Sequence, residues 1–222
     1  MQDDPLSQTV IVFDLDDTLY PEASYLRSGM KYVCDKLATL FQTPFQDRLD
    51  EAVAAGEVDW LDFLCHEAGL PVAAKEALLW SYRLHPPSIG LSPSCAAMLS
   101  EVERRAKAVA ILTDGRSLTQ RLKVTALRLS HIPLYISEDY GSEKPDPLRF
   151  RLIEERWSAD RYVYIGDNPR KDFQACNELG WWSVGVANRG DNIHCYEVDS
   201  FPRNALPQYW IAEWKELFSI LC

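Results

Sequence analysis

The sequence predicts an α/β protein: an open parallel sheet in a three-layer, Rossmann-like core, with a small all-helical cap inserted after the first strand. Five short apolar runs are nearly continuous rather than alternating in polarity, which is typical of strands covered on both faces. Helix-like stretches separate the last four runs, which favours right-handed crossovers in a parallel sheet. The roughly ninety residues between the first two runs are too many for one crossover.

The core elements follow in order from these runs. The predicted strands span residues 10–13, 109–112, 134–136, 162–165 and 183–186. The helices predicted between the last four strands span residues 118–129, 147–157 and 173–179. Strand and helix alternate without an internal repeat or a low-complexity segment. We therefore expect one layered core.

Helical stripes fill the long segment after the first strand. A first stripe steps by four and three residues through Leu26, Met30, Val33, Leu37 and Leu40. Residues 61–68 carry a second stripe, and residues 77–82 indicate a third. The segment "HPPSIGLSPS" (85–94) is rich in proline and is typical of a hinge or linker. We predict a core domain of residues 1–20 and 91–222 and a helical cap domain of residues 21–90.

Composition excludes several classes of protein. The 222 residues are 47% hydrophobic and 25% charged, as in ordinary soluble globular proteins. A net charge of −10 argues against binding of a nucleic-acid backbone, which requires clustered Lys and Arg. No apolar run approaches the ~18 to 20 residues of a membrane span, and the polar N-terminus is unlike a signal peptide. We expect a cytoplasmic protein whose six scattered cysteines are reduced thiols.

Polar residues follow four of the predicted strands at their carboxyl ends, where ligands bind in open parallel sheets. They are Asp14 and Asp16 after the first strand, Thr113, Asp114 and Gly115 after the second, Lys144 after the third, and Gly166, Asp167 and Asp172 after the fourth. Residues i and i+2 of an extended segment face the same side, so Asp14 and Asp16 can share one crevice. Crowded carboxylates need a cation, and oxygen ligands without His or Cys favour Mg²⁺.

Four motifs identify a resemblance to the haloacid dehalogenase-like (HAD) hydrolase superfamily. "DLDDTLY" is similar to its first motif, "ILTDG" to its second, "EKPDP" to its lysine motif and "GDNPRKD" to its fourth motif of paired acids. Each motif is weak alone, but all four come in the right order after a predicted strand. The resemblance covers residues 10 to 172, and the insertion at 21–90 resembles the helical cap of the superfamily's first cap class.

The resemblance implies a role for each motif residue. Asp14 looks like the nucleophile that forms an aspartyl-phosphate, and Asp16 like the general acid and base, which needs a raised pKa. Thr113 and Lys144 would bind the phosphate, and Lys144 would also orient Asp14. Mg²⁺ would be held by Asp14, the main-chain carbonyl of Asp16, Asp167 and, through water, Asp172. Because Asp172 opens a predicted helix, an N-cap role is its alternative.

Two further groups of residues have candidate roles in substrate binding. The backbone N–H groups near Asp114 and Gly115 could donate to an anion. Asp114 stands where many relatives carry Asn, and Arg116 could compensate for its charge by pairing with it or with substrate. We hypothesise that Asp114 and Arg116 both take part in recognition of the leaving group, such as a sugar. Tyr20 is a candidate contact with the leaving group or an ordinary packed residue, whereas Asp17 and Thr18 are expected to be turn or capping residues.

The predicted function is a Mg²⁺-dependent phosphomonoester hydrolase acting on a small metabolite, such as a nucleotide or a sugar phosphate. The acid at position 16 favours this reaction over dehalogenation, because the superfamily's dehalogenases lack that acid. A dehalogenase-type hydrolase stays an alternative, as does a phosphotransferase or receiver-like phospho-acceptor module in signalling. The expected partner is a phosphorylated small molecule, with neither nucleic acid nor membrane, and the protein is expected to be a monomer or a homodimer.

The C-terminal residues lie outside the motifs. An apolar stripe on one predicted helix runs through Trp210, Ile211, Trp214, Leu217, Phe218 and Leu221. Such a stripe must be buried, and we expect it to dock on the core of its own chain. A dimer contact is the alternative.

Overall fold

The structure is a computed structural model, and it describes residues 4–56, 59–188, 190–193 and 196–222. The chain divides into two compact units. The core unit comprises Met1–Ala23 and Gly90–Cys222, and the helical unit comprises Ser24–Ile89. Cys195, one of the cysteines expected to be reduced thiols, lies outside the described residues.

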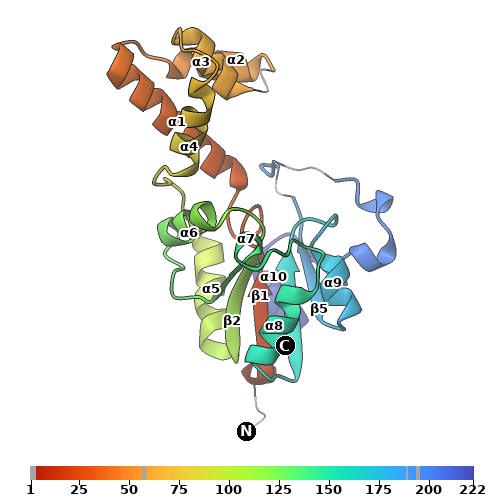
Figure 1. Cartoon of the computed structure of the whole chain (residues 1–222). Coiled ribbons are helices and arrows are strands. Elements are labelled where there is room, and N and C mark those ends of the chain that lie inside the picture. Colours follow the sequence, from red (N-terminus) through yellow and green to blue (C-terminus); the bar gives the residue numbers. More distant parts are fainter. Residues whose placement is uncertain (1–3, 57–58, 189, 194–195) are drawn as a thin grey trace. The chain divides into compact units, whose positions relative to one another are not determined.

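The core unit contains a six-stranded parallel sheet in the order β3-β2-β1-β4-β5-β6. Its strands are β1 (Thr9–Phe13), β2 (Ala108–Thr113), β3 (Leu134–Ile136), β4 (Arg161–Gly166), β5 (Trp182–Val186) and β6 (Tyr209–Ile211). Figure 1 labels β1 and β2, which are paired neighbours in this sheet. The five predicted strands are confirmed to within one residue at each end, because their buried runs fit a sheet covered on both faces. The strand order reverses at β1, which lies between β2 and β4.

Helices pack on both faces of this sheet. They are α5 (Pro93–Arg105), α6 (Ser117–Ala126), α7 (Ser137–Tyr140), α8 (Leu148–Arg156), α9 (Phe173–Glu178) and α10 (Trp214–Leu221). Side chains of α8 and α9, among them Phe150 and Phe173, pack on Val10 and Val12 of β1. The three predicted crossover helices are confirmed as α6, α8 and α9, so the α/β core has the expected architecture.

Helix α5 was missing from the sequence prediction. The segment 85–94 was interpreted as a linker, but its last residues start this helix: Ser92 is the N-cap and accepts a hydrogen bond from the N–H of Cys95 at 3.2 Å. Pro93 fits the first helical position because its missing N–H has no intrahelical partner there. The proline that indicated a linker therefore also begins a helix.

The segment from residue 24 to residue 89 is helical, as predicted for its described residues. Its helices are α1, which begins in the core unit (Glu22–Phe41), α2 (Gln46–Ala54), α3 (Trp60–Glu67) and α4 (Ala74–Arg83). Val33, Leu37, Leu49 and Leu64 form its own hydrophobic core. The first apolar stripe was extended too far, because Leu40 is 76% exposed. Helix α2 was not predicted.

The C-terminal stripe is only partly helical. Tyr209–Ile211 is strand β6, which pairs with β5, and the prediction that Trp210 and Ile211 belong to the helix is wrong. Helix α10 starts at Trp214, and Glu213 and Glu216 form a capping box at its N-terminus. A capping box satisfies backbone N–H groups at a helix start and so favours a separate helix here. Its residues Trp214, Leu217 and Leu221 are buried, and the Trp214 ring lies 6.4 Å from that of Phe13 in β1. The stripe docks on its own core, as expected.

Among the described residues, none of the helices combines the length and the apolar character that a membrane crossing requires.

Candidate active site

Two neighbouring strands place the acidic residues at one edge of the sheet. Asp14 directly follows β1 and Asp167 directly follows β4, and these strands are paired in parallel. The N–H of Asp14 donates to the carbonyl oxygen of Ile165 at 2.8 Å, which fixes the backbone at the end of β1. A hollow of about 150 Å³ opens here, and its walls include Asp14, Asp16, Thr113, Asp114, Asp167 and Lys171. The hollow lies where the strand order reverses, the usual ligand position in such sheets.

Lys144 lies beneath the hollow and bridges two carboxylates. Its Nζ is 2.6 Å from Oδ1 of Asp14 and 2.7 Å from Oδ1 of Asp172, and it also donates to the Tyr164 hydroxyl at 3.0 Å. The side chain of Lys144 is fully buried. A buried ammonium group needs such partners, because its charge is otherwise costly away from water. The predicted pairing of Lys144 with Asp14 is present, while Tyr164 had no role in the sequence prediction.

Asp172 acts as a hub for the loop after β4. It stands at the N-cap position of α9, but its side chain makes no capping hydrogen bond. Its Oδ2 instead accepts from the N–H of Asp167 at 3.1 Å and from the N–H of Asn168 at 2.8 Å. The capping alternative is therefore wrong. Asp172 shapes the loop that carries Asp167 and simultaneously holds Lys144.

A substitution at Gly166 should displace this hub. A Cβ at Gly166 would lie 2.5 Å from Oδ2 of Asp172, closer than such contacts allow. We expect Gly166→Ala to lower kcat/KM by on the order of 10²-fold, because a shift of about 1 Å at a reacting group costs that much. Steady-state assays would measure the loss in kcat/KM, and circular dichroism would check that the variant is folded. Gly90→Ala is the control, since Gly90 is exposed, a Cβ there meets nothing within 4 Å and its φ is not in the left-handed region. Unchanged kinetics for Gly166→Ala would contradict the role of Asp172 as a hub.

The carboxylates are so close that a cation or a proton must offset part of their negative charge. Oxygen atoms of Asp14, Asp167 and Asp172 all lie within 4.8 Å of one another. Burial raises the pKa of Asp14 to about 6, with Lys144 opposing and Asp172 reinforcing the effect. Burial, with the charges of Asp172 and Asp14, raises the pKa of Asp167 to about 9. Three carboxylates and one lysine leave excess negative charge, so the donor set fits a hard divalent ion with oxygen ligands.

Asp16 lies in a different electrostatic environment from the predicted one. Its carboxylate accepts hydrogen bonds from Lys123, from Gln120 and from the Tyr20 hydroxyl. Burial alone would raise the pKa of Asp16, but the Lys123 charge and these hydrogen bonds outweigh it and lower the pKa. The prediction of a raised pKa is therefore wrong. In the described part of the chain, the Asp16 carboxylate also lies outside the group of three close carboxylates.

The residues after β2 have partners of their own. Thr113 is buried, and its hydroxyl oxygen accepts a hydrogen bond from Nε2 of Gln120 at 2.7 Å. Gly115 has a φ of +137°, a conformation that favours glycine, and its N–H donates to the Ser137 hydroxyl at 2.9 Å. The expectation that this N–H is available to an anion is wrong, because Ser137 already accepts from it.

An Asp114–Arg116 pair, one of the two roles considered for Arg116, does not form, and contact of Arg116 with substrate stays a prediction. Asp114 accepts a hydrogen bond from Nη2 of Arg149, a fully buried residue of α8. Arg116 instead lies 3.8 Å from Glu138, with half of its side chain exposed. Burial would raise the pKa of Asp114, but the charges of Lys144 and Arg149 prevail and lower it. Asp114 still lines the hollow, so its carboxylate fixes the wall rather than pairing with Arg116.

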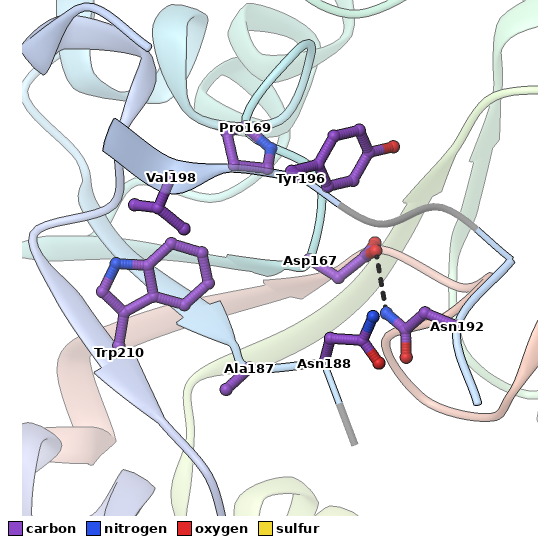
Figure 2. Close-up of a pocket in the computed structure, with 8 residues that line it drawn as sticks. All are labelled: Asp167, Pro169, Ala187, Asn188, Asn192, Tyr196, Val198 and Trp210. Atoms are coloured by element: carbon purple, nitrogen blue, oxygen red, sulfur yellow. Dashed lines mark hydrogen bonds between the residues drawn. The ribbon is translucent and has the colours of Figure 1, made fainter. Parts of the chain in front are cut away.

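The loop after β5 adds residues that the motifs did not indicate. Nδ2 of Asn192 lies 3.3 Å from Oδ2 of Asp167, and the N–H of Ile193 donates to Oδ2 of Asp17 at 3.0 Å. Figure 2 shows the Asn192–Asp167 contact at the edge of a second hollow of about 300 Å³. Apolar side chains form much of its wall: Pro169, Ala187, Val198 and Trp210. Asp167 thus borders both hollows.

The turn after β1 behaves largely as expected. Asp17 has a φ of +56° and accepts a hydrogen bond from the N–H of Glu22, as a turn residue does. Thr18 is more than a turn residue, because its hydroxyl lies 3.4 Å from Oδ1 of Asp167. Glu22, also in the wall of the hollow, was not predicted, and burial with the Asp16 charge raises its pKa to about 7. A sequence signal existed for Gln120 and Lys123: two polar residues one turn apart on a core helix.

The parallel sheet, with buried Asp14 and Lys144 at its carboxyl edge, defines an open α/β protein with an aspartate site where the strand order reverses. Residues 8–180 match the model of the haloacid dehalogenase-like hydrolases, and the chain belongs to this family.

Known proteins resemble the chain to different extents. Phosphoserine phosphatase of Thermus thermophilus is 32% identical over 148 residues, which are 61% of this chain and 58% of that protein. The chain thus spans less than two thirds of that relative. Ribulose-1,5-bisphosphate 5-phosphatase of Halopiger xanaduensis is 25% identical over 79% of this chain and 83% of that protein. The HAD hydrolase YfnB of Bacillus subtilis has a similar structure, with a TM-score of 0.63 and 19% sequence identity. The match covers 96% of this chain and 98% of the YfnB chain.

Proposed function

We propose that the protein is a Mg²⁺-dependent phosphomonoester hydrolase that acts on a small metabolite, a nucleotide or a sugar phosphate, through an aspartyl-phosphate on Asp14. One observation carries this proposal. Asp14 faces a solvent-accessible hollow, and the buried Nζ of Lys144 lies 2.6 Å from its carboxylate. A carboxylate held by a buried cation is a positioned nucleophile rather than a surface charge.

The reaction would proceed in two displacements. A carboxylate oxygen of Asp14 attacks phosphorus, the bond between phosphorus and the ester oxygen breaks, and the leaving oxygen takes a proton from the Asp16 carboxyl group. Asp16 would carry that proton in the substrate complex, because the negative charge of the phosphate ester raises the carboxyl pKa that Lys123 lowers in the free protein. Asp16, now a carboxylate, then takes a proton from a water molecule as that water attacks the phosphorus of the aspartyl-phosphate. The bond between Asp14 and phosphorus breaks, which releases phosphate and restores both side chains.

The other residues of the hollow would bind and orient. Lys144 fixes the rotamer of Asp14 and offsets the negative charge of the phosphoryl group, and the Thr113 hydroxyl can donate to a phosphoryl oxygen. The carboxylates of Asp14 and Asp167 and the main-chain carbonyl of Asp16 would bind Mg²⁺. Asp172 would bind the ion indirectly, through a water molecule. When bound, the ion offsets the charge of the phosphoryl oxygens and of the crowded carboxylates.

Two named relatives and one solved structure support this proposal. Two of them, from Thermus thermophilus and Halopiger xanaduensis, are named as phosphatases of small phosphorylated metabolites. YfnB was solved with magnesium bound. The two named phosphatases share a reaction class but differ in substrate. An assay with a substrate panel therefore decides between a nucleotide and a sugar phosphate.

Removal of the divalent ion tests the proposal. We expect EDTA to lower phosphate release from a panel of nucleotide and sugar phosphates by on the order of 10²-fold or more, and added Mg²⁺ to restore it. Phosphate release is measured colorimetrically. Ca²⁺ should restore little, because it prefers longer bonds and more ligands. Full activity in EDTA, halide release from 2-haloacids, or a phosphoprotein that never turns over would each contradict the proposal.

A binding assay separates the ion from the chemistry. Mg²⁺ should raise the melting temperature of the wild-type protein by a few degrees, because an ion that binds only the folded state stabilises it. Asp167→Asn should abolish this rise, since it removes one of the close carboxylates. Asp191→Asn, at an exposed aspartate outside that group, is the control and should keep the rise.

A further inference from the structure

Three donors hold the carboxylate of Asp16. Nζ of Lys123 lies 2.8 Å from its Oδ1 and 2.9 Å from its Oδ2, and Nε2 of Gln120 lies 2.9 Å from Oδ2. The Tyr20 hydroxyl donates to Oδ1. We call Lys123, Gln120 and Tyr20 the Asp16 clamp. Its members come from the turn after β1 and from α6, so the clamp joins two separate parts of the core unit.

The clamp is buried where an ordinary surface lysine would be solvated. The Lys123 side chain is 5% exposed and that of Asp16 is 18% exposed. Removing an ammonium group from water is costly, and only good geometry with a charged partner offsets that cost. Both carboxylate oxygens of Asp16 contact Nζ, which satisfies this condition. Meanwhile Asp16 still lines the hollow beside Asp14, so the clamp restrains a side chain that remains accessible to substrate.

The clamp also reaches the phosphate-binding side of the hollow. Gln120 donates from the same Nε2 to Asp16 and to the Thr113 hydroxyl, at 2.9 and 2.7 Å. Gln120 and Lys123 lie one turn apart on α6 and face the same side. Helix α6 thereby sets the position of Asp16 after β1 relative to Thr113 after β2.

From these contacts we infer that Lys123 is a positioning residue for proton transfer. It fixes the Asp16 carboxyl group where the leaving oxygen of the substrate departs, and Gln120 and Tyr20 assist it. This inference rests on the proposed function, in which Asp16 protonates the leaving oxygen. The only proton that moves passes between Asp16 and the leaving oxygen or the attacking water.

Leaving-group dependence distinguishes positioning from a merely structural role. A p-nitrophenolate leaves without a proton, whereas the alkoxide of glycerol 2-phosphate needs one. We expect Lys123→Met to lower kcat/KM for glycerol 2-phosphate by about 10- to 100-fold and for p-nitrophenyl phosphate by less than about 3-fold. The constant kcat/KM is the right readout, because it ends with the departure of the leaving group and is blind to later hydrolysis of the aspartyl-phosphate.

Two further variants complete the test. Lys123→Arg keeps a cation that can contact both carboxylate oxygens, so it should recover most of the activity towards glycerol 2-phosphate. Lys107→Met removes an exposed lysine that contacts Gln8, and it should leave both substrates unaffected. Equal losses on both substrates for Lys123→Met, or no loss on either, would overturn the inference.

A reference variant separates this inference from the proposed function. Asp16→Asn should show the same selective loss on glycerol 2-phosphate. If Asp16→Asn shows no selective loss, the proposed function fails. If Asp16→Asn shows the selective loss and Lys123→Met does not, only the positioning role of Lys123 fails. Should Lys123→Met not fold, Tyr20→Phe decides, because it removes a single hydroxyl from the clamp. We expect a selective loss of about 3- to 10-fold from it, and a non-selective effect would overturn the inference.

Discussion

Asp14→Asn should abolish turnover of phosphate esters, with a loss in kcat on the order of 10⁴-fold or more, as for other covalent nucleophiles. An amide oxygen is a poor nucleophile, and it cannot form the aspartyl-phosphate that divides the hydrolysis into two easier steps. The Asn side chain has nearly the same size as Asp, so the hollow keeps its shape. Steady-state phosphate release with Mg²⁺ measures the loss.

Trapping of the intermediate gives this prediction a second readout. Wild-type protein quenched in acid during turnover should carry one phosphoryl group at Asp14 by peptide mass spectrometry, and Asp14→Asn should carry none. Asp160→Asn, which removes an exposed carboxylate just before β4, is the control and should keep full activity. Turnover by Asp14→Asn at the wild-type rate would refute the nucleophile assignment.

Arg149→Met should cause the largest loss of stability. Arg149 is fully buried, donates to the carbonyl oxygens of Thr113 at 2.8 Å and Tyr135 at 3.3 Å, and pairs with Asp114. Methionine fills a similar volume but leaves the Asp114 charge and two carbonyl groups without this donor. Breaking a buried ion pair from one side costs about 3–5 kcal/mol, which corresponds to a fall in melting temperature on the order of 10 °C.

A neighbouring arginine provides the matched control. Arg151 lies on the same helix α8 but is exposed, so Arg151→Met should change the melting temperature by less than about 2 °C. Adding Asp114→Asn to Arg149→Met should recover part of the loss, because the second change removes the uncompensated charge. Calorimetry of Arg149→Met, Arg151→Met and the double variant would measure these changes in melting temperature. Equal melting temperatures for Arg149→Met and Arg151→Met would show that the buried pair does not stabilise the fold.

Most of the sheet was predictable because its signal is local. The strands from β1 to β5 are buried apolar runs, and each run is visible within a few residues of sequence. Strand β6 has only three residues, of which Tyr209 and Trp210 are 42% and 38% exposed. Its place depends on pairing with β5, a long-range contact without a local pattern. Two of its residues, Trp210 and Ile211, were consequently assigned to the neighbouring helix.

The sequence by itself determined strands β1 to β5, the helical insertion and the position of Asp14, Thr113, Lys144 and Asp167 after adjoining strands. It could do so because parallel strands all end at the same edge, so position along each strand is enough.

Only the tertiary structure decided which side chains meet. It paired Asp114 with Arg149 instead of Arg116, and it gave Asp16 the clamp of Lys123, Gln120 and Tyr20. It also excluded the alternative of a helix cap for Asp172, whose carboxylate instead accepts from the loop after β4. The physical reason is that a buried charge selects its partner by distance and orientation in three dimensions. Residues from helices packed on the sheet satisfy that requirement, and their spacing in the sequence does not reveal it.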